Sequence, residues 1–265
     1  MLAVAVGLVA AVAGCSTKGV PYKSPTSAPT SATAAASAAA TATAPTEADG
    51  ALPTASMTPL PAASGQLTGS ELETVLLPAS DFPSGFTASS SGATSSGGSL
   101  TTDAAAYPLA TVSCADFEQH LGSTGFGETA MAADSVVGTE QAFDQLIYQF
   151  ASAAQAKAFV AGIAALAARC ASFTAPADGS TGTFSFSATP GAPLAGLPTV
   201  ELKQTGKVTG SAVALDTLFT ASGVDVFAAA AVGLGISAAT VPTVPAKETI
   251  VYNLMKRQAA AAVLG

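Results

Sequence analysis

Residues 16–66 contain almost no large side chains, and this limits which part of the chain can fold. The tract consists mainly of Ala, Thr, Ser and Pro with scattered charges. Such residues bury too little apolar surface to offset the conformational entropy lost on ordering. We therefore predict a disordered segment over residues 15–66, which separates an N-terminal targeting stretch, residues 1–14, from a folded domain, residues 67–265.

The chain is apolar without a break from Leu2 to Ala13. A helix of this length rises about 18 Å, well short of a hydrocarbon core of roughly 30 Å. The run is therefore predicted to be the apolar region of a cleaved signal peptide rather than a membrane-spanning helix. Because signal peptides carry a positive charge ahead of this region and only Met1 precedes it, we expect further sequence or the natural start codon upstream.

Val12-Ala13-Gly14-Cys15 closes the apolar run. It resembles the bacterial lipobox, in which small residues precede a lipid-modified cysteine. The resemblance implies that Cys15 receives a diacylglyceryl thioether carrying palmitate-type chains and becomes the first residue of the mature protein. Two acyl chains suffice for stable anchoring. We predict a lipoprotein on the outer face of the cell membrane, tethered through residues 15–66; the alternative is an ordinary secretory signal with Cys15 unmodified.

The charge balance is acidic, with 9 Lys and Arg residues against 17 Asp and Glu residues and a formal net charge of -8. A nucleic-acid binder needs a basic surface to displace counterions from phosphates. No nucleic-acid partner is therefore expected. An acidic surface of low charge is typical of a protein exposed outside the cell, and we expect a monomer.

Helical and strand patterns alternate irregularly through the domain. The predicted helices are 71–77, 114–121, 152–170 and 246–264, and the predicted strands are 110–112, 129–137, 141–150, 183–188, 199–204, 211–221 and 224–232. Segment 89–99 and the segment containing Pro176 and Gly179 are predicted to be loops. Several antiparallel strands with helices before, between and after them predict an α+β fold, in which helices pack on a curved antiparallel sheet.

Three local patterns are clear. Thr68-Gly69-Ser70-Glu71 and Ser70-Glu71-Leu72-Glu73 both fit a capping box at a helix start. In the strand 141–150, alternation places Phe143, Gln145, Ile147 and Gln149 on one face, and Asp144, Leu146, Tyr148 and Phe150 on the other. Phe159, Ile163 and Leu166 form one apolar stripe on the helix that Ser152 begins.

With Cys15 assigned to lipid, Cys114 and Cys170 remain. Two cysteines in an exported domain are most simply a disulfide. The bond would close a loop of roughly 60 residues, for which the chain-entropy model gives about 4 kcal/mol. It would join the start of one helix to the end of another. The alternative, a reactive thiol with His120 as its base, requires a reducing compartment.

The sequence offers little that could perform catalysis. His120 is the only histidine, so a site of several histidines is excluded, and no Gly-x-Ser-x-Gly elbow surrounds a serine. The acidic residues Asp116, Glu118, Asp134 and Asp144 are scattered over separate elements, so a glycosidase pair would require the fold to bring two of them together. We expect no metal, no cofactor, no catalytic residue and no enzymatic activity.

Two residues are candidates for contact with a ligand. Tyr148 lies on the aromatic strand, where it belongs either to the core or to a ligand platform. Asp216 interrupts an apolar strand, so its carboxylate faces either solvent or a cleft.

The order of these segments is familiar. Leu76–Phe86, Cys114, Leu146–Phe150, Ser152–Phe159 and Cys170 follow one another as they do in actinobacterial sensor-domain lipoproteins, which this chain resembles over residues 67–235. That family is similar to the extracellular domain of PknH-type receptor kinases. The resemblance implies an antiparallel sheet, packed helices and a cleft for a small ligand.

The chain departs from the kinase-linked members at two points. They have two disulfides and an aromatic residue shortly before the second cysteine, where this chain has one cysteine pair and Ala167-Ala168-Arg169. No kinase portion occurs in this sequence. The family's ligand residues are therefore not carried over.

The leading hypothesis is a membrane-anchored, non-catalytic module that binds or senses a small molecule or lipid. A carrier or chaperone for a lipid or envelope component is the first alternative, since Ala- and Val-rich strands could line an apolar cavity. An envelope hydrolase, which would need carboxylates converging beside His120, is the second.

Overall fold

The computed structural model describes residues 57–61, 65–82, 84–88, 94–95, 109–121, 125–138, 141–177, 180–208, 211–234 and 246–264. Cys15, the targeting stretch and most of the predicted tether lie outside these residues. Met57 and Leu60 pack against the core, so ordered contacts begin before Leu67, where we expected the domain to start.

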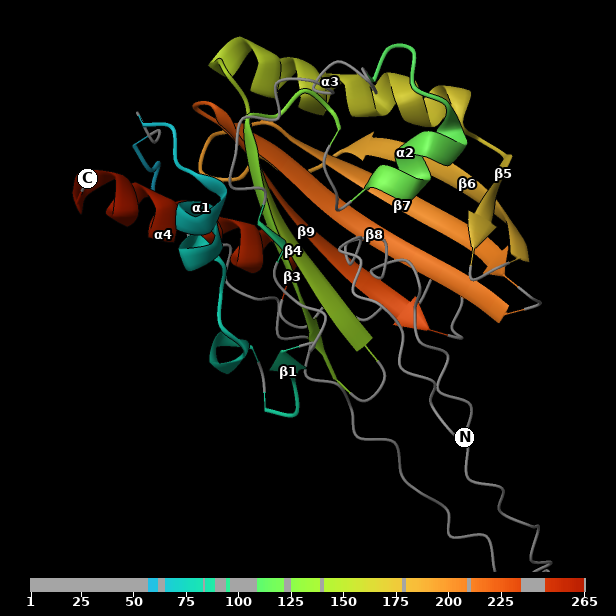
Figure 1. Ribbon diagram of the computed structural model, residues 1–265, viewed down its shortest axis with the longest axis horizontal. Coiled ribbons are helices and arrows are strands. Elements are labelled where there is room, and N and C mark those ends of the chain that lie inside the picture. Colours follow the sequence, from blue (N-terminus) through green and yellow to red (C-terminus); the bar gives the residue numbers. More distant parts are fainter. Residues whose placement is uncertain are drawn as a thin grey trace, which may run out of the picture. The chain divides into compact units, whose positions relative to one another are not determined.

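One antiparallel sheet organises the domain (Figure 1). Its strands in the described residues are β1 (Thr87–Ala88), β2 (Thr94–Ser95), β3 (Ala130–Val137), β4 (Gln141–Gln149), β5 (Phe173–Ala177), β6 (Ser180–Pro190), β7 (Thr199–Val208), β8 (Ser211–Ser222) and β9 (Asp225–Leu234). Their order is β1-β3-β4-β9-β8-β7-β6-β5, with β2 also paired to β3. Strand β9 pairs with β4 on one side and β8 on the other, and so joins the β3–β4 hairpin to the β5–β9 meander.

Helices cover both faces of this sheet. They are α1 (Gly69–Val75), the short 3-10 helix η2 (Ala79–Asp81), α2 (Cys114–His120), α3 (Ala153–Arg169) and α4 (Lys247–Leu264). Helices α2 and α3 pack on one face and α1 and α4 on the other, as Figure 1 shows. The predicted α+β class, an antiparallel sheet with helices packed on it, is confirmed. In the described residues, none of the helices has the length and apolar character needed to cross a membrane.

The alternation predicted for β4 is confirmed by its packing. Phe143 and Ile147 belong to the core beneath α1 and α4, whereas Leu146 and Tyr148 belong to the core beneath α3. The strand is therefore buried on both faces. Two polar residues of the first face, Gln145 and Gln149, are also fully buried.

The helix starts follow the predicted caps. Of the two possible capping boxes, the first is used: the Glu71 N–H donates to Thr68 Oγ1 at 3.3 Å, and the Thr68 N–H donates to the Glu71 carboxylate at 2.7 Å. Helix α1 consequently begins at Gly69, two residues earlier than expected, and ends at Val75. Ser152 caps α3 as predicted, and Ser113 caps α2.

Three local predictions were wrong. The expected strand 110–112 is a turn, because the backbone carbonyls of Leu109 and Val112 both accept hydrogen bonds from Arg169 instead of pairing with a strand. The expected loop around Pro176 contains β5, an edge strand in which a residue without an N–H is tolerated. Within the predicted loop 89–99, Thr94–Ser95 form β2.

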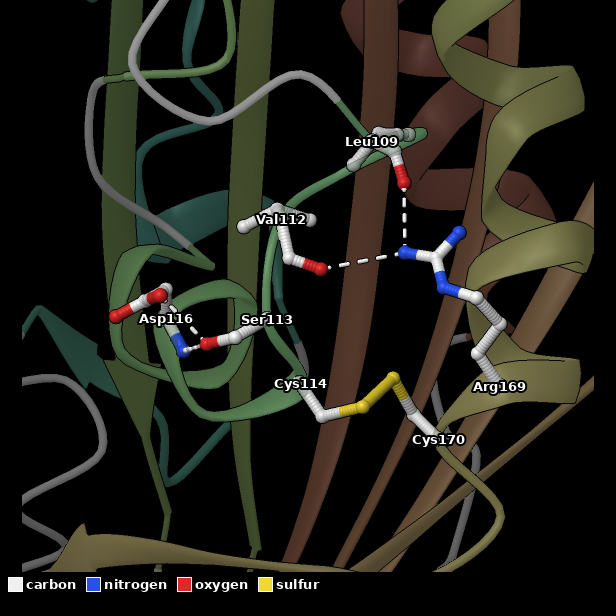
Figure 2. The surroundings of a disulfide bond; sticks show 7 residues. All are labelled: Leu109, Val112, Ser113, Cys114, Asp116, Arg169 and Cys170. Atoms are coloured by element: carbon white, nitrogen blue, oxygen red, sulfur yellow. Dashed lines mark hydrogen bonds between the residues drawn. A yellow bond between two sulfur atoms is a disulfide. The ribbon is translucent and has the colours of Figure 1, made fainter.

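The predicted disulfide joins Cys114, the first residue of α2, to Cys170, the C-cap of α3 (Figure 2). The two Cα atoms are 5.5 Å apart. Arg169, the neighbour of Cys170, donates to the carbonyls of Leu109 and Val112 at 3.0 and 3.2 Å. The segment that leads into α2 is thus attached to the end of α3 by one covalent bond and two hydrogen bonds.

Replacing Cys114 or Cys170 with Ala is expected to lower the free energy of unfolding by about 2–5 kcal/mol, because the unfolded chain is no longer constrained. Urea unfolding followed by circular dichroism measures this. The double replacement is the matched control, since it should lose little more than either single variant if both report the same bond. An unfolding midpoint that is unchanged in all three variants would contradict the prediction.

Candidate functional site

Tyr148, one of the two candidate ligand residues, is fully buried between β4 and α3. Its ring lies 5.5 Å from that of Phe159 and 6.2 Å from that of Phe126, measured between centroids. The side chain is part of the aromatic core on the α3 face.

Asp216, the other candidate, lies on β8 on the α4 face of the sheet. Its carboxylate is 2.5 Å from the ammonium of Lys247, which is also 3.9 Å from Glu201 on β7. Lys247 is only 3% exposed. Asp216 therefore pairs with a buried lysine of the first turn of α4.

His120 ends α2, and its Nδ1 lies 2.7 Å from the carbonyl oxygen of Asp116. Burial raises the pKa of Glu128, which is 1% exposed, and its backbone hydrogen bonds and His120 oppose that rise. Both oxygens of Glu128 already accept backbone N–H groups, from Gly125 at 2.8 Å and Phe126 at 2.7 Å. These contacts hold the loop that brings Phe126 into the core.

Two buried amides of β4 hold the chain on either side of α1. The side chain of Gln145 accepts from the N–H of Leu77 at 2.8 Å and donates to its carbonyl at 2.7 Å. Gln149 Oε1 accepts from the N–H of Leu67 at 2.8 Å. Gln145 and Gln149, the two polar residues on this face of β4, thus form hydrogen bonds with backbone groups of Leu77 and Leu67 that have no partner in a neighbouring strand.

Gln149 also takes part in a buried network with Asp225 of β9. The Gln149 amide donates to Asp225 Oδ1 at 3.0 Å, and the Gln258 amide of α4 donates to Asp225 Oδ2 at 2.6 Å. Burial raises the pKa of Asp225 to about 6, against the effect of the two hydrogen bonds. Asp144, which accepts from the Ser135 hydroxyl at 2.5 Å, also has its pKa raised to about 6 by burial.

In a third buried group, three oxygens lack hydrogen-bond partners. Glu118 of α2 is 6% exposed, and Gln204 Nε2 of β7 donates to its Oε1 at 2.7 Å. Burial raises the pKa of Glu118 to about 7. Its Oε2, the Oε1 of Gln204 and the Oγ1 of Thr217 have no hydrogen-bond partner. We call Glu118, Gln204 and Thr217 the polar cluster.

The strand register brings the cluster together. Leu202 is opposite Thr217, and Gln204 is opposite Leu215, so Gln204 and Thr217 are diagonal neighbours on one face of the β7–β8 pair. Diagonal neighbours lie about 7 Å apart, within reach of long side chains. Glu118 reaches the same face from helix α2.

Helix α2 is held in the position that this requires. Cys114 and Glu118 are four residues apart, so they share one face of the helix. The disulfide therefore fixes the same face that carries Glu118. Phe117 packs beside it, with its ring 5.5 Å from Phe126 and 5.5 Å from Phe186.

Glu118 was considered in the sequence only as one of four scattered acids, and Gln204 and Thr217 were not identified. A weak pattern exists: Thr217 alternates with Leu215 and Phe219, and Gln204 with Leu202, so each polar residue occupies an apolar strand position. In the part of the chain that the structure describes, there is no group of three or more His, Cys, Asp and Glu residues suited to a metal.

No protein-family model matches the sequence, and no curated protein matches it. Among solved structures, the fold resembles the extracellular domain of PknH from Mycobacterium tuberculosis, with a TM-score of 0.48 and 17% identity over 76% of this chain and 99% of that one. A putative uncharacterized protein from Mycobacterium smegmatis, the Rv0999 ortholog, matches with a TM-score of 0.36 and 13% identity over 74% of this chain and 96% of that one.

Asp225 is expected to make stability fall as pH rises. Its carboxyl binds its proton more tightly in the folded state, with a pKa near 6, than in the unfolded state, where the ordinary value is 3.8. The contribution of Asp225 to stability is thus fully present below about pH 4 and is lost as the pH rises through 6, by about 3 kcal/mol. Denaturant unfolding between pH 4 and pH 8 measures the slope.

Asp225→Asn is expected to make this slope shallower and to remain as stable as the parent at pH 8. The raised pKa values of Asp144 and Glu118 keep the rest of the slope. Gln258 Oε1 has no partner, so turning that amide over lets it accept from the amide introduced at position 225. Asp81→Asn, at an exposed residue, is the matched control and should keep the slope. A variant that is much less stable than the parent at pH 8 would contradict this account.

Proposed function

We propose that this chain is an extracytoplasmic lipoprotein, anchored to the outer face of the cell membrane through Cys15, whose domain binds a ligand and catalyses no reaction. The observation that carries the proposal is the polar cluster of Glu118, Gln204 and Thr217, in which three buried oxygens lack partners. Sensing of a small molecule is the role that such a domain would serve at the cell surface.

The cellular location is supported by the Cys114–Cys170 bond, because disulfides persist in oxidising compartments. The apolar run that ends at Gly14-Cys15 supplies the means of export and anchoring. The two features are independent, since one lies in the domain and the other at the N-terminus.

Ligand binding is supported by the energy of the cluster. A buried polar group without a partner costs about 1–3 kcal/mol, and native proteins contain few of them. Gln145, Gln149 and Asp225 accept or donate bonds in the same sheet, so this fold is able to satisfy buried polar groups. An occupant that supplies the missing bonds accounts for the exception at Glu118.

The absence of catalysis is supported by how the acid–base groups are used. Both carboxylate oxygens of Glu128 accept hydrogen bonds from backbone N–H groups. Asp225 accepts hydrogen bonds from the side-chain amides of Gln149 and Gln258. Asp116 accepts from the Ser113 hydroxyl at the helix cap. These contacts stabilise loops and helix ends.

Anchoring is tested by Cys15→Ser in the full chain. The parent is expected in the membrane fraction, with residues 1–14 removed and acyl mass added, and the variant in the medium. Ser16→Ala is the control and should remain on the membrane. An intact mass of the parent that shows neither acyl addition nor loss of residues 1–14 would overturn the lipoprotein assignment.

Ligand binding is tested by native mass spectrometry of the Cys15→Ser chain secreted by its own host. A polar adduct or ion retained by the folded protein and lost on unfolding is the expected result. A copurifying lipid would overturn the sensor assignment in favour of a carrier.

A further inference from the structure

The unpartnered atoms of the polar cluster are all oxygens: Glu118 Oε2, Gln204 Oε1 and Thr217 Oγ1. Carboxylate and amide oxygens only accept hydrogen bonds, and a hydroxyl can accept as well as donate. What is missing is therefore a group that donates to several oxygens at once, or a cation that they coordinate.

The charge of the cluster is also incomplete. Among the described residues, the ion pairs are those of Lys247 with Asp216 and Glu201, and none involves Glu118. The pKa of Glu118 is shifted by burial and by the Gln204 hydrogen bond alone. An ionised Glu118 thus carries one buried negative charge that no side chain of the described chain offsets, a costly arrangement.

The surroundings restrict the size of an occupant. Glu118, Gln204 and Thr217 are 6%, 1% and 1% exposed. Next to them the sheet is apolar: Ala142, Leu215, Ala230 and Val232 form a small cluster, against which Leu121 packs at the end of α2. A compact occupant is favoured over a bulky one. One carboxylate also matches a single positive charge better than the 6–8 oxygen ligands of Ca²⁺.

We infer that the polar cluster of Glu118, Gln204 and Thr217 binds one compact monovalent cation, either an inorganic ion or the primary ammonium group of a small molecule. This deepens the proposed ligand-binding function and rests on it. The carboxylate supplies the charge, and the amide and hydroxyl oxygens supply neutral ligands. Protonation of Glu118, whose pKa is about 7, removes the buried charge at lower pH; above that pH, a water molecule would satisfy some of the oxygens but would leave the charge uncompensated.

The test measures thermal unfolding of the full-length Cys15→Ser chain at pH 8 and constant ionic strength. Chlorides of sodium, potassium, ammonium and methylammonium are compared with tetramethylammonium chloride, whose cation is bulky and donates no hydrogen bond. At tenfold the dissociation constant, a bound ion should raise Tm by about 3–5 °C. An effect of sodium or potassium alone identifies an inorganic ion, and an effect of ammonium and methylammonium identifies an amine; both support the site.

Glu118→Gln keeps the size of the side chain and its bond to Gln204, but removes the charge, and should abolish the cation effect. Asp81→Asn is the matched control and should retain it. Thr217→Val, a second variant that keeps the charge, should weaken the effect. Equal Tm values in all five salts, or the same cation effect in Glu118→Gln, would overturn the inference.

A direct readout on the full-length Cys15→Ser chain avoids dependence on substitutions in the polar cluster. Crystals soaked in rubidium chloride should show an anomalous peak between Glu118 and Thr217, and an empty or water-filled site there would overturn the inference for inorganic ions. For amines, the deciding result is whether the effect of methylammonium on Tm is lost in Glu118→Gln. Failure here leaves the anchoring result and the native mass spectrum as separate tests of the proposed function.

Discussion

The bond between Cys114 and Cys170 fixes the arrangement of the α3 face. Helix α2 has only seven residues, and a helix this short is not stable by itself. The disulfide ties its first residue to the end of the longer α3, and Arg169 attaches the preceding turn to the same place. Phe117 and Glu118 can then be held against the sheet together. The position of the polar cluster therefore depends on a covalent link one helical turn away.

The two faces of the sheet differ in how their buried polar groups are hydrogen-bonded. On the α1 and α4 face, the buried side chains of Gln145 and Gln149 form hydrogen bonds with backbone groups on either side of α1. Asp225 accepts hydrogen bonds from two side-chain amides. These networks are nearly complete and specify how helices seat on the sheet. On the α2 and α3 face, the polar cluster is incomplete. The two faces of one sheet therefore differ in how completely their buried polar groups are hydrogen-bonded.

Much of the fold could be predicted from the sequence because its determinants are local. Ser113 and Ser152 begin helices by capping, alternation in 141–150 gives both faces of β4, and two cysteines left after Cys15 pair with each other. Pro176 misled the prediction because a proline is excluded from central strands but not from an edge, and the edge is known only from the whole sheet. The turn at 110–112 depends in the same way on Arg169, far along the chain.

The candidate site was not predictable for the same reason. Gln204 and Thr217 become neighbours only through the β7–β8 register, and Glu118 reaches them only after α2 is tied to α3. In the sequence, Tyr148 and Asp216 differ from their neighbours as an aromatic residue and an acid in apolar strands. Tyr148 lies in the core, and Asp216 pairs with Lys247, a residue whose burial no local pattern indicated.

The ion pair between Lys247 and Asp216 restricts the position of helix α4 along the sheet. A basic residue in the first turn of a helix opposes the helix dipole, so its presence there has to be offset by contacts elsewhere. A slide of one turn, about 5.4 Å, would separate the buried ammonium from the carboxylate of Asp216. Apolar packing thus holds the helix on the sheet, and the ion pair of Lys247, together with the hydrogen bond from Gln258 to Asp225, determines its position along the sheet.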